Sequence, residues 1–211
     1  MAFEGKNLLL YAVGGADGKE SFLTDLESAL KGGITCFQLR EKHLPFGEFL
    51  AEAREVKKLC AKYDVPLIIN DNTEIALSCG ADGVHIGQDD GNVAEVRRIA
   101  GSRLVIGVSA HNVEEALAAE KAGADYLGSG AVFGSATKSN VQTLPLETLK
   151  NICSSVNIPV VAIGGINETN MMQLAGTGID GVAVISAIFG AEDIESKCKE
   201  LKTLSARIAG R

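Results

Sequence analysis

Short runs rich in β-branched residues alternate with helical patterns along the whole chain, and this alternation limits the fold more than any other feature. Eight strand–helix units of about 25 residues follow one another, the length of a strand, a helix and two short loops. Gly-Ala-Asp precedes two of the predicted strands, at residues 80–82 and 123–125, and Gly-Ile-Asp precedes a third, at 178–180. Eight such units close most simply into a (β/α)8 barrel, the TIM-barrel fold.

The predicted elements fill the chain without a linker, so we expect a single domain over residues 1–211. The predicted strands are residues 8–13, 34–40, 67–70, 83–86, 104–109, 125–128, 159–163 and 181–185. The predicted helices are residues 20–31, 46–62, 73–79, 93–100, 113–122, 146–153, 168–175 and a last one within 193–208. A doubly wound sheet is the alternative, but no Gly-x-Gly-x-x-Gly follows the first strand.

Composition and charge exclude several classes of protein. The net charge of −7 argues against a general nucleic-acid binder, because phosphate backbones need a basic surface. No apolar run approaches the ~20 residues of a membrane helix, and the N-terminus lacks the order of a signal peptide. The five cysteines form no Cys-x-x-Cys pair, which is typical of reduced thiols in the cytosol. We therefore expect a cytoplasmic protein without nucleic-acid or membrane partners.

Charged residues follow the second predicted strand. Alternation along this strand places Gln38, Arg40 and then Lys42 on one face, with Phe37 and Leu39 on the other. Two cations at the end of a buried strand need an anion or open water. Because active sites of such barrels lie at the carboxyl ends of the strands, an anion site is one interpretation, and a solvated loop is the other.

Carboxylates follow the third and fourth predicted strands. Asp71 comes after Asn70, and Asp89 and Asp90 come after the next strand. Hard oxygen ligands with several retained waters suit Mg²⁺ better than zinc. A Mg²⁺ site made by Asp71 with Asp89 or Asp90 is therefore one hypothesis, and helix capping or turn formation is the alternative. The three histidines have no tight ligand spacing, so we expect roles other than metal binding for them.

Features typical of phosphate binding follow the last two predicted strands. Gly164-Gly165 precedes a predicted helix and Ser186 follows the final strand, where barrels often bind phosphate through main-chain N–H groups. Glycines that only form a tight turn are the alternative. The longest connection includes residues 132–140, with hydroxyls, a glycine and Lys138. Such a loop is typical of a lid, although a plain mobile loop has the same composition.

Taken in order, these segments resemble the thiamine phosphate synthase family over nearly the whole chain, from Leu10 to about Ile188. The matching motifs are Gln38-Leu-Arg-Glu-Lys42, Asn70-Asp71, Gly83-Val-His-Ile-Gly-Gln88, Gly107-Val-Ser-Ala-His111, Thr137-Lys138 and Ile163-Gly-Gly-Ile166. One departure lies in the loop, where the family often has Pro-Thr and this chain has Gly134-Ser135, so we expect the glycine to loosen the loop.

The resemblance implies a role for each candidate residue. An aminopyrimidine diphosphate would be bound by Gln38, Leu39, Arg40, Glu41, Lys42, Asn70, Ser109 and Lys138. A thiazole phosphate would be bound by Ser135, Ala136, Thr137, Gly165, Ile185 and Ser186. Mg²⁺, the cofactor implied, would be held by Asp71 and Asp90.

The reaction implied by the resemblance joins the two substrates and releases diphosphate. Arg40, Lys42 and Lys138 would be the catalytic residues, because their charges would neutralise the departing diphosphate. The partners expected are these small molecules, and the sequence is compatible with a homo-oligomer. Three alternatives stay open: a thiazole tautomerase, which would not need paired carboxylates, a non-catalytic phosphate-sensing barrel, and a phosphate-sugar epimerase suggested by fold alone.

Overall fold

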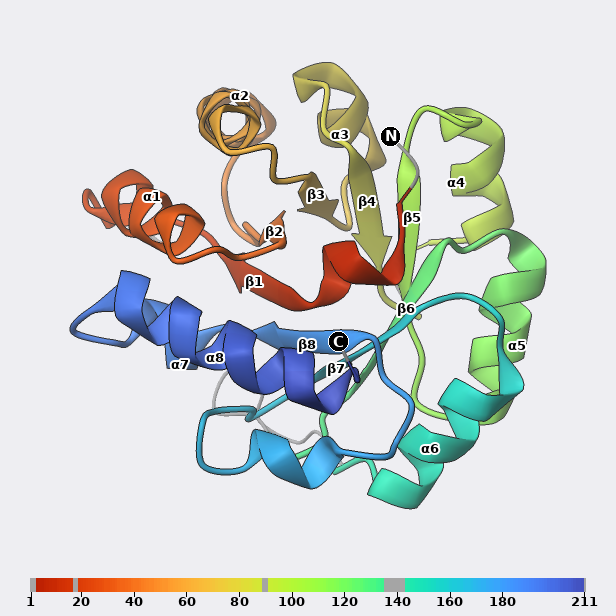
Figure 1. Cartoon of the computed structure of the whole chain (residues 1–211). Coiled ribbons are helices and arrows are strands. Elements are labelled where there is room, and N and C mark those ends of the chain that lie inside the picture. Colours follow the sequence, from red (N-terminus) through yellow and green to blue (C-terminus); the bar gives the residue numbers. More distant parts are fainter. Residues whose placement is uncertain (1–2, 17–18, 89–90, 135–142, 211) are drawn as a thin grey trace.

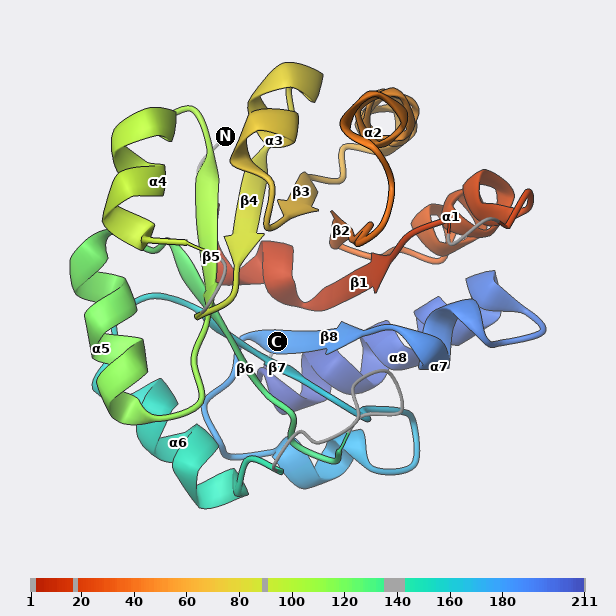
Figure 2. The same cartoon turned by 180° about the vertical axis from the view of Figure 1, so that it is seen from behind.

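Eight parallel strands form a closed barrel in the computed structural model, which describes residues 3–16, 19–88, 91–134 and 143–210. Each strand pairs with its neighbours in sequence, and β8 pairs with β1 to close the ring, with Leu10 opposite Val182 (Figures 1 and 2). The strands are β1 (Leu10–Gly14), β2 (Cys36–Leu39), β3 (Leu67–Asn70), β4 (Gly83–Ile86), β5 (Val105–Ser109), β6 (Tyr126–Gly130), β7 (Val160–Ile163) and β8 (Gly181–Val184).

Helices surround the barrel on its outside (Figures 1 and 2). The α-helices are α1 (Phe22–Lys31), α2 (Phe46–Lys62), α3 (Thr73–Cys79), α4 (Val93–Ala100), α5 (Val113–Ala122), α6 (Leu146–Ser155), α7 (Ser186–Phe189) and α8 (Ile194–Ile208), and the 3₁₀ helices are η1 (Gly5–Leu8) and η2 (Met171–Leu174). This arrangement confirms the (β/α)8 barrel expected from the sequence. Of the helices in the described ranges, none has both the length and the apolarity needed to cross a membrane.

Side chains alternate along the strands between two apolar layers. Outward-facing residues such as Leu10, Phe37 and Ile106 pack beneath the helices in the larger layer. Inward-facing residues such as Tyr11 and Ile68 fill the barrel in a smaller one. Burial on both faces explains why the strands read as nearly continuous hydrophobic runs in the sequence.

The repeated Gly-Ala-Asp tripeptides supply caps at the amino end of the barrel. In four pairs, the residue just before an even-numbered strand accepts a hydrogen bond from a main-chain N–H at or near the start of the preceding odd-numbered strand. The pairs are Leu10 with Thr35 (2.9 Å), Leu67 with Asp82 (2.8 Å), Ile106 with Asp125 (2.7 Å) and Val160 with Asp180 (3.0 Å). Buried main-chain N–H groups need partners, and these side chains supply them at four equivalent places. The aspartates repeated in the sequence therefore correspond to a hydrogen bond repeated in the structure.

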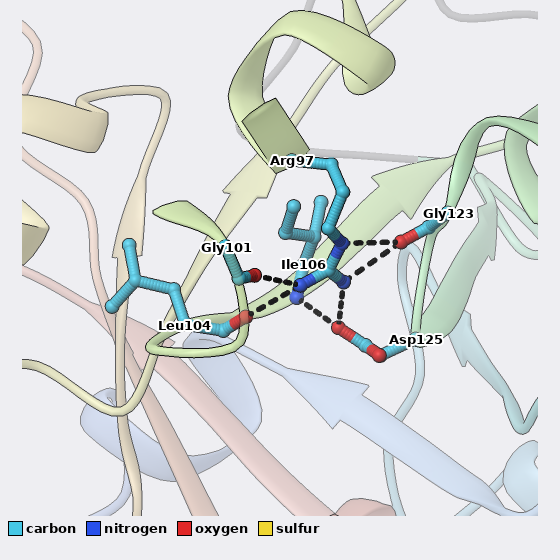
Figure 3. A network of polar contacts seen from close by, with 6 residues as sticks. All are labelled: Arg97, Gly101, Leu104, Ile106, Gly123 and Asp125. Carbon is cyan, nitrogen blue, oxygen red and sulfur yellow. Dashed lines mark hydrogen bonds and ion pairs between the residues drawn. The ribbon is translucent and has the colours of Figure 1, made fainter. Parts of the chain in front are cut away.

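Arg97 on α4 ties several connections together at the same end of the barrel (Figure 3). Its guanidinium donates to the carbonyl of Gly101 at 2.7 Å and to that of Leu104 at 3.1 Å, both in the connection to β5. It also donates to the carbonyl of Gly123 at 2.8 Å and forms an ion pair with Asp125, just before β6. One side chain therefore fixes the entries to two neighbouring strands.

The segment after β7 departs from the helix expected at residues 168–175. Only the short turn η2 forms there. The Asn170 side chain accepts a hydrogen bond from the Asn167 N–H at 2.9 Å and donates to the Gly165 carbonyl at 2.8 Å. Because such side-chain bonds compete with the bonds of a helix, the prediction of a full helix was wrong here.

Candidate active site

A pocket of about 210 Å³ opens at the carboxyl ends of the strands, opposite the Asp caps. Polar side chains from β2 to β5 form one side, and the turns after β7 and β8 form the other. The lining residues are Tyr11, Val13, Gln38, Arg40, Asn70, His85, Ser109, His111, Gly128, Gly130, Ala131, Val161, Ile163, Gly164, Gly165, Ile166, Ala183, Val184, Ile185 and Ser186.

The end of β2 confirms the alternation expected from the sequence. Gln38 is buried and Arg40 half-buried, and both line the pocket. The Leu39 side chain lies in the outer layer, turned away from the pocket. Lys42 is exposed and lies beyond the end of β2, so strand alternation no longer determines its direction. Glu41 is half-buried, and its carboxylate lies close to the turn that follows β1.

Asn70 and Asp71 lie at the carboxyl end of β3, and neither caps the following helix. Asn72 does so, because its side chain accepts a hydrogen bond from the Ile75 N–H at 2.9 Å. Asp71 has a left-handed backbone with φ of 62°, and its N–H donates to the His85 carbonyl at 2.8 Å. The Asn70 amide donates to the Asp71 carboxylate. The capping interpretation of Asn70 and Asp71 is therefore wrong.

The donor set around Asp71 fits a hard cation such as Mg²⁺. It consists of a half-buried carboxylate and the amide of Asn70, both oxygen donors, next to the pocket. Within the described residues, no group of three or more His, Cys, Asp or Glu side chains could hold a metal by itself. Mg²⁺ sites often use only one or two carboxylates, with substrate phosphates completing the shell. Asp90, the second expected ligand, and Asp89 lie outside the described residues.

Five polar residues form a continuous hydrogen-bonded network at the base of the pocket, which we call the floor network; all but Tyr126 line the pocket. Gln38 Nε2 donates to Tyr11 Oη at 2.7 Å, and Tyr11 Oη lies 2.8 Å from Tyr126 Oη. Tyr126 Oη lies 3.1 Å from His85 Nδ1, and His85 Nε2 lies 3.1 Å from Ser109 Oγ. The network thus links two expected ligand-binding residues, Gln38 and Ser109, from β2 to β5.

Gly107 on β5 makes room for this network. A Cβ atom there would lie 2.1 Å from Cζ of Tyr126 and 2.5 Å from Nδ1 of His85, so no other residue fits. Burial raises the pKa of Tyr126, and burial together with the Tyr126 phenol raises that of Tyr11. Both phenols therefore stay neutral at ordinary pH, and each keeps one hydrogen to donate.

The turns after β7 and β8 bring together the residues expected to hold phosphate. Gly165, Ile185 and Ser186 all line the pocket. Gly165 has φ of +65°, and a Cβ atom there would lie 2.7 Å from the Phe133 carbonyl oxygen. The Asn170 amide donates a hydrogen bond to the Gly165 carbonyl. The position therefore needs glycine, because the turn after β7 packs closely against the main chain that follows β6.

Sequence reasoning missed Tyr11 and Tyr126, and it gave His85 no contact. A signal was present, because tyrosine at an inward-facing strand position needs a partner for its hydroxyl group. Four expected residues of the loop after β6, Ser135, Ala136, Thr137 and Lys138, lie outside the described residues.

Comparison with known proteins gives the family. The sequence model described as thiamine monophosphate synthase matches residues 10–188. The chain belongs to the thiamine monophosphate synthase family. It is a transferase, as thiamine-phosphate synthases are.

Two curated relatives and one solved structure agree with this assignment. Thiamine-phosphate synthase of Clostridium tetani is 51% identical over 176 residues, 83% of this chain and 84% of that protein. Thiamine-phosphate synthase 2 of Streptococcus pneumoniae is 48% identical over 181 residues, 86% of each chain. The structure of thiamine phosphate pyrophosphorylase from Pyrococcus furiosus is 39% identical, with a TM-score of 0.89 over 97% of this chain and 98% of that one.

A more distant solved structure shares the fold alone. It is 3-hexulose-6-phosphate synthase, which is 18% identical with a TM-score of 0.73. The phosphate-sugar epimerase alternative therefore gains no support from sequence identity. The synthase assignment is supported by relatives that are 51% identical.

Proposed function

We propose that the chain catalyses the Mg²⁺-dependent condensation of 4-amino-2-methyl-5-(diphosphooxymethyl)pyrimidine with thiazole phosphate, giving thiamine phosphate and diphosphate. The observation that carries the proposal is the divided lining of a single pocket. Gln38, Arg40 and Ser109 line one side, and Gly165 and Ser186 line the other. Such a pocket suits two ligands that bring their anionic groups to different edges.

The leaving diphosphate would be met by cations at the β2 side. Arg40 lines the pocket, and its guanidinium can hold two phosphate oxygens at once. Lys42, exposed after the same strand, and Lys138, in the loop outside the described residues, would add charge. Preorganised positive charge that meets developing negative charge lowers the barrier to departure.

Loss of diphosphate would leave a cation at the pyrimidine methylene carbon, which the thiazole nitrogen then captures. That nitrogen already carries a lone pair, so the step needs no protein base and no covalent nucleophile. Ser109 and His85 are hydrogen-bonded, but the other ring nitrogen of His85 is bonded to the Tyr126 phenol. A neutral phenol lacks the negative charge with which a carboxylate stabilises the imidazolium of a Ser-His-Asp triad. The turns at Gly165 and Ser186 would hold the second substrate in position.

Mg²⁺ would supply positive charge that stabilises the diphosphate as it leaves. Asp71 would hold it together with Asp90, and the Asn70 amide would orient the Asp71 carboxylate. A chain with a net charge of −7 would then bind a strongly anionic substrate through a local concentration of cations.

A product assay tests the proposal. We expect purified protein with both substrates and Mg²⁺ to form thiamine phosphate and diphosphate in equal amounts, and excess EDTA to stop the reaction until Mg²⁺ is restored. Omission of either substrate is the control. Failure to form thiamine phosphate under the complete conditions would overturn the proposal, and thiazole isomerisation without the pyrimidine would favour the tautomerase.

A further inference from the structure

The floor network has a direction, because each of its members has few hydrogens to give. Tyr11 accepts from the Gln38 amide nitrogen and can give its single hydrogen to Tyr126, whose oxygen is a better acceptor than the buried Cys36 thiol that also bonds to Tyr11. The Tyr126 hydrogen is then directed to His85 Nδ1, and His85 Nε2–H donates to Ser109 Oγ. The hydroxyl hydrogen of Ser109 is left to donate to a ligand in the pocket.

The two ends of the floor network are therefore coupled. With its nitrogen toward Tyr11, Gln38 offers its amide oxygen to a ligand, while Ser109 offers a hydrogen. Rotation of the Gln38 amide by half a turn reverses every bond: Gln38 then offers N–H, and Ser109 offers an oxygen lone pair. In either direction, with a neutral imidazole in the middle, one end donates and the other accepts.

The burial of the network enforces this rule. Tyr11 is 1% exposed and Tyr126 is 0% exposed, so neither phenol can exchange its partner for bulk water. A break in the direction would leave the Tyr11 hydrogen with only the Cys36 sulfur, a weak acceptor, or would cost His85 its hydrogen bond to Tyr126 or Ser109, and either loss is costly inside the barrel. A neutral His85 imidazole, with one nitrogen donating and the other accepting, passes the direction of the network on between Tyr126 and Ser109.

We propose that the floor network is a specificity device that obliges a ligand touching both Gln38 and Ser109 to donate one hydrogen bond and accept the other. This inference rests on the proposed function, since an aminopyrimidine offers that pair through its exocyclic amino group and a ring nitrogen. Tyr126 is a positioning residue in this device, because its hydroxyl group links the two ends without lining the pocket.

The test compares two pyrimidine diphosphates on wild type and Tyr126→Phe. One carries the 4-amino group, and the other carries a 4-methoxy group, which accepts but cannot donate. In wild type the coupling prevents Gln38 and Ser109 from both donating to the methoxy compound, which therefore binds poorly. In Tyr126→Phe the two side chains reorient independently, so both can donate. We expect the ratio of kcat/KM for the amino over the methoxy compound to fall about tenfold in the variant, roughly the effect of one hydrogen bond. The KM for thiazole phosphate should stay unchanged.

Tyr63→Phe is the matched control. It removes a phenol hydroxyl that donates to Glu27 at the surface, away from the pocket, and should leave the ratio as in wild type. Tyr11→Phe breaks the neighbouring link and should lower the ratio as Tyr126→Phe does, which covers the case in which Tyr126→Phe does not fold.

Calorimetric binding of the two diphosphates without thiazole phosphate separates this inference from the proposed function. Wild-type preference for the amino compound that falls in Tyr126→Phe supports the inference, even if turnover is absent and the proposed function fails. Equal losses for both compounds, with the ratio intact, indicate a purely structural role and overturn it. A wild type that does not prefer the amino compound also overturns it.

Discussion

Three consecutive residues, Asn70, Asp71 and Asn72, do different work although their side chains differ little. Asn70 lines the pocket, Asp71 lies beside it with a left-handed backbone, and Asn72 caps α3. Strand periodicity predicts which residue faces the pocket, but the backbone rotation at Asp71 lies beyond the strand and leaves no periodic signal. The residue types at the end of this strand therefore indicated the site, but they did not assign the three roles.

Removal of the Asp71 charge should weaken Mg²⁺ binding. Asp71→Asn keeps the shape and tolerates the left-handed backbone, so we expect the Mg²⁺ concentration for half-maximal activity to rise about tenfold or more. Asp64→Asn is the control, because exposed Asp64 also has a left-handed backbone, with φ of 55°. A Mg²⁺ titration of Asp71→Asn that overlays the wild type would exclude Asp71 as a ligand.

The residues of the pocket and the floor network divide by how far apart their partners lie in sequence. Gln38 and Arg40 followed from alternation within one strand. Tyr11 and Tyr126 escaped prediction because their hydroxyl groups meet across 115 positions, and only the closed barrel brings them together.

Among the elements, helices α3, α4 and α5 match their predicted bounds at both ends. Each begins after an asparagine whose side chain accepts from a main-chain N–H three residues later, and each is followed by glycine. Local signals of this kind are readable from sequence. Residues 168–175 carry an asparagine as well, but the Asn170 side chain bonds back to the main chain of the turn before it. Residue type alone does not distinguish this backward bond from a helix cap, so the difference was not readable from the sequence.

The strand caps should contribute measurable stability. In Asp82→Ala the Leu67 N–H and the Lys57 ammonium both lose their carboxylate partner, so we expect a loss of about 1 to 2 kcal/mol in the free energy of unfolding. Urea denaturation measures it. Glu55→Ala, which removes an exposed carboxylate paired with Lys58, should change stability by less than about 0.5 kcal/mol. Equal effects of the two substitutions would show that the cap adds nothing.

At the scale of the whole molecule, the barrel separates stability from chemistry by its two ends. The capping residues and Arg97 lie where the strands begin, and the pocket lies where they end. Loops at the carboxyl end are thereby free to vary while the opposite end keeps the barrel closed. This division was predictable, because the alternation of strands and helices alone indicated the fold.

Two adjacent arginines on α4 test whether the amino end of the barrel contributes to stability without contributing to catalysis. Arg97→Ala removes a guanidinium with four partners, so we expect the free energy of unfolding to fall by about 2 to 3 kcal/mol. Arg98→Ala removes an exposed side chain 3.9 Å from Glu95 and should have little effect. Both folded variants should keep wild-type kcat/KM at 25 °C. Selective loss of activity in Arg97→Ala without loss of stability would contradict the division.

The alternation of the strand caps also sorts the barrel into modules. Each odd-numbered strand depends on the residue before the next even-numbered one, so β1–β2, β3–β4, β5–β6 and β7–β8 form four self-capped pairs. A chain rejoined at its ends and reopened between pairs, for instance between β4 and β5, would keep every cap within an uncut pair. Opening it inside a pair would place a capping side chain and its amide at opposite ends of the chain. Circular permutation thus has natural and unnatural cutting points in this barrel, set by hydrogen bonds far from the pocket.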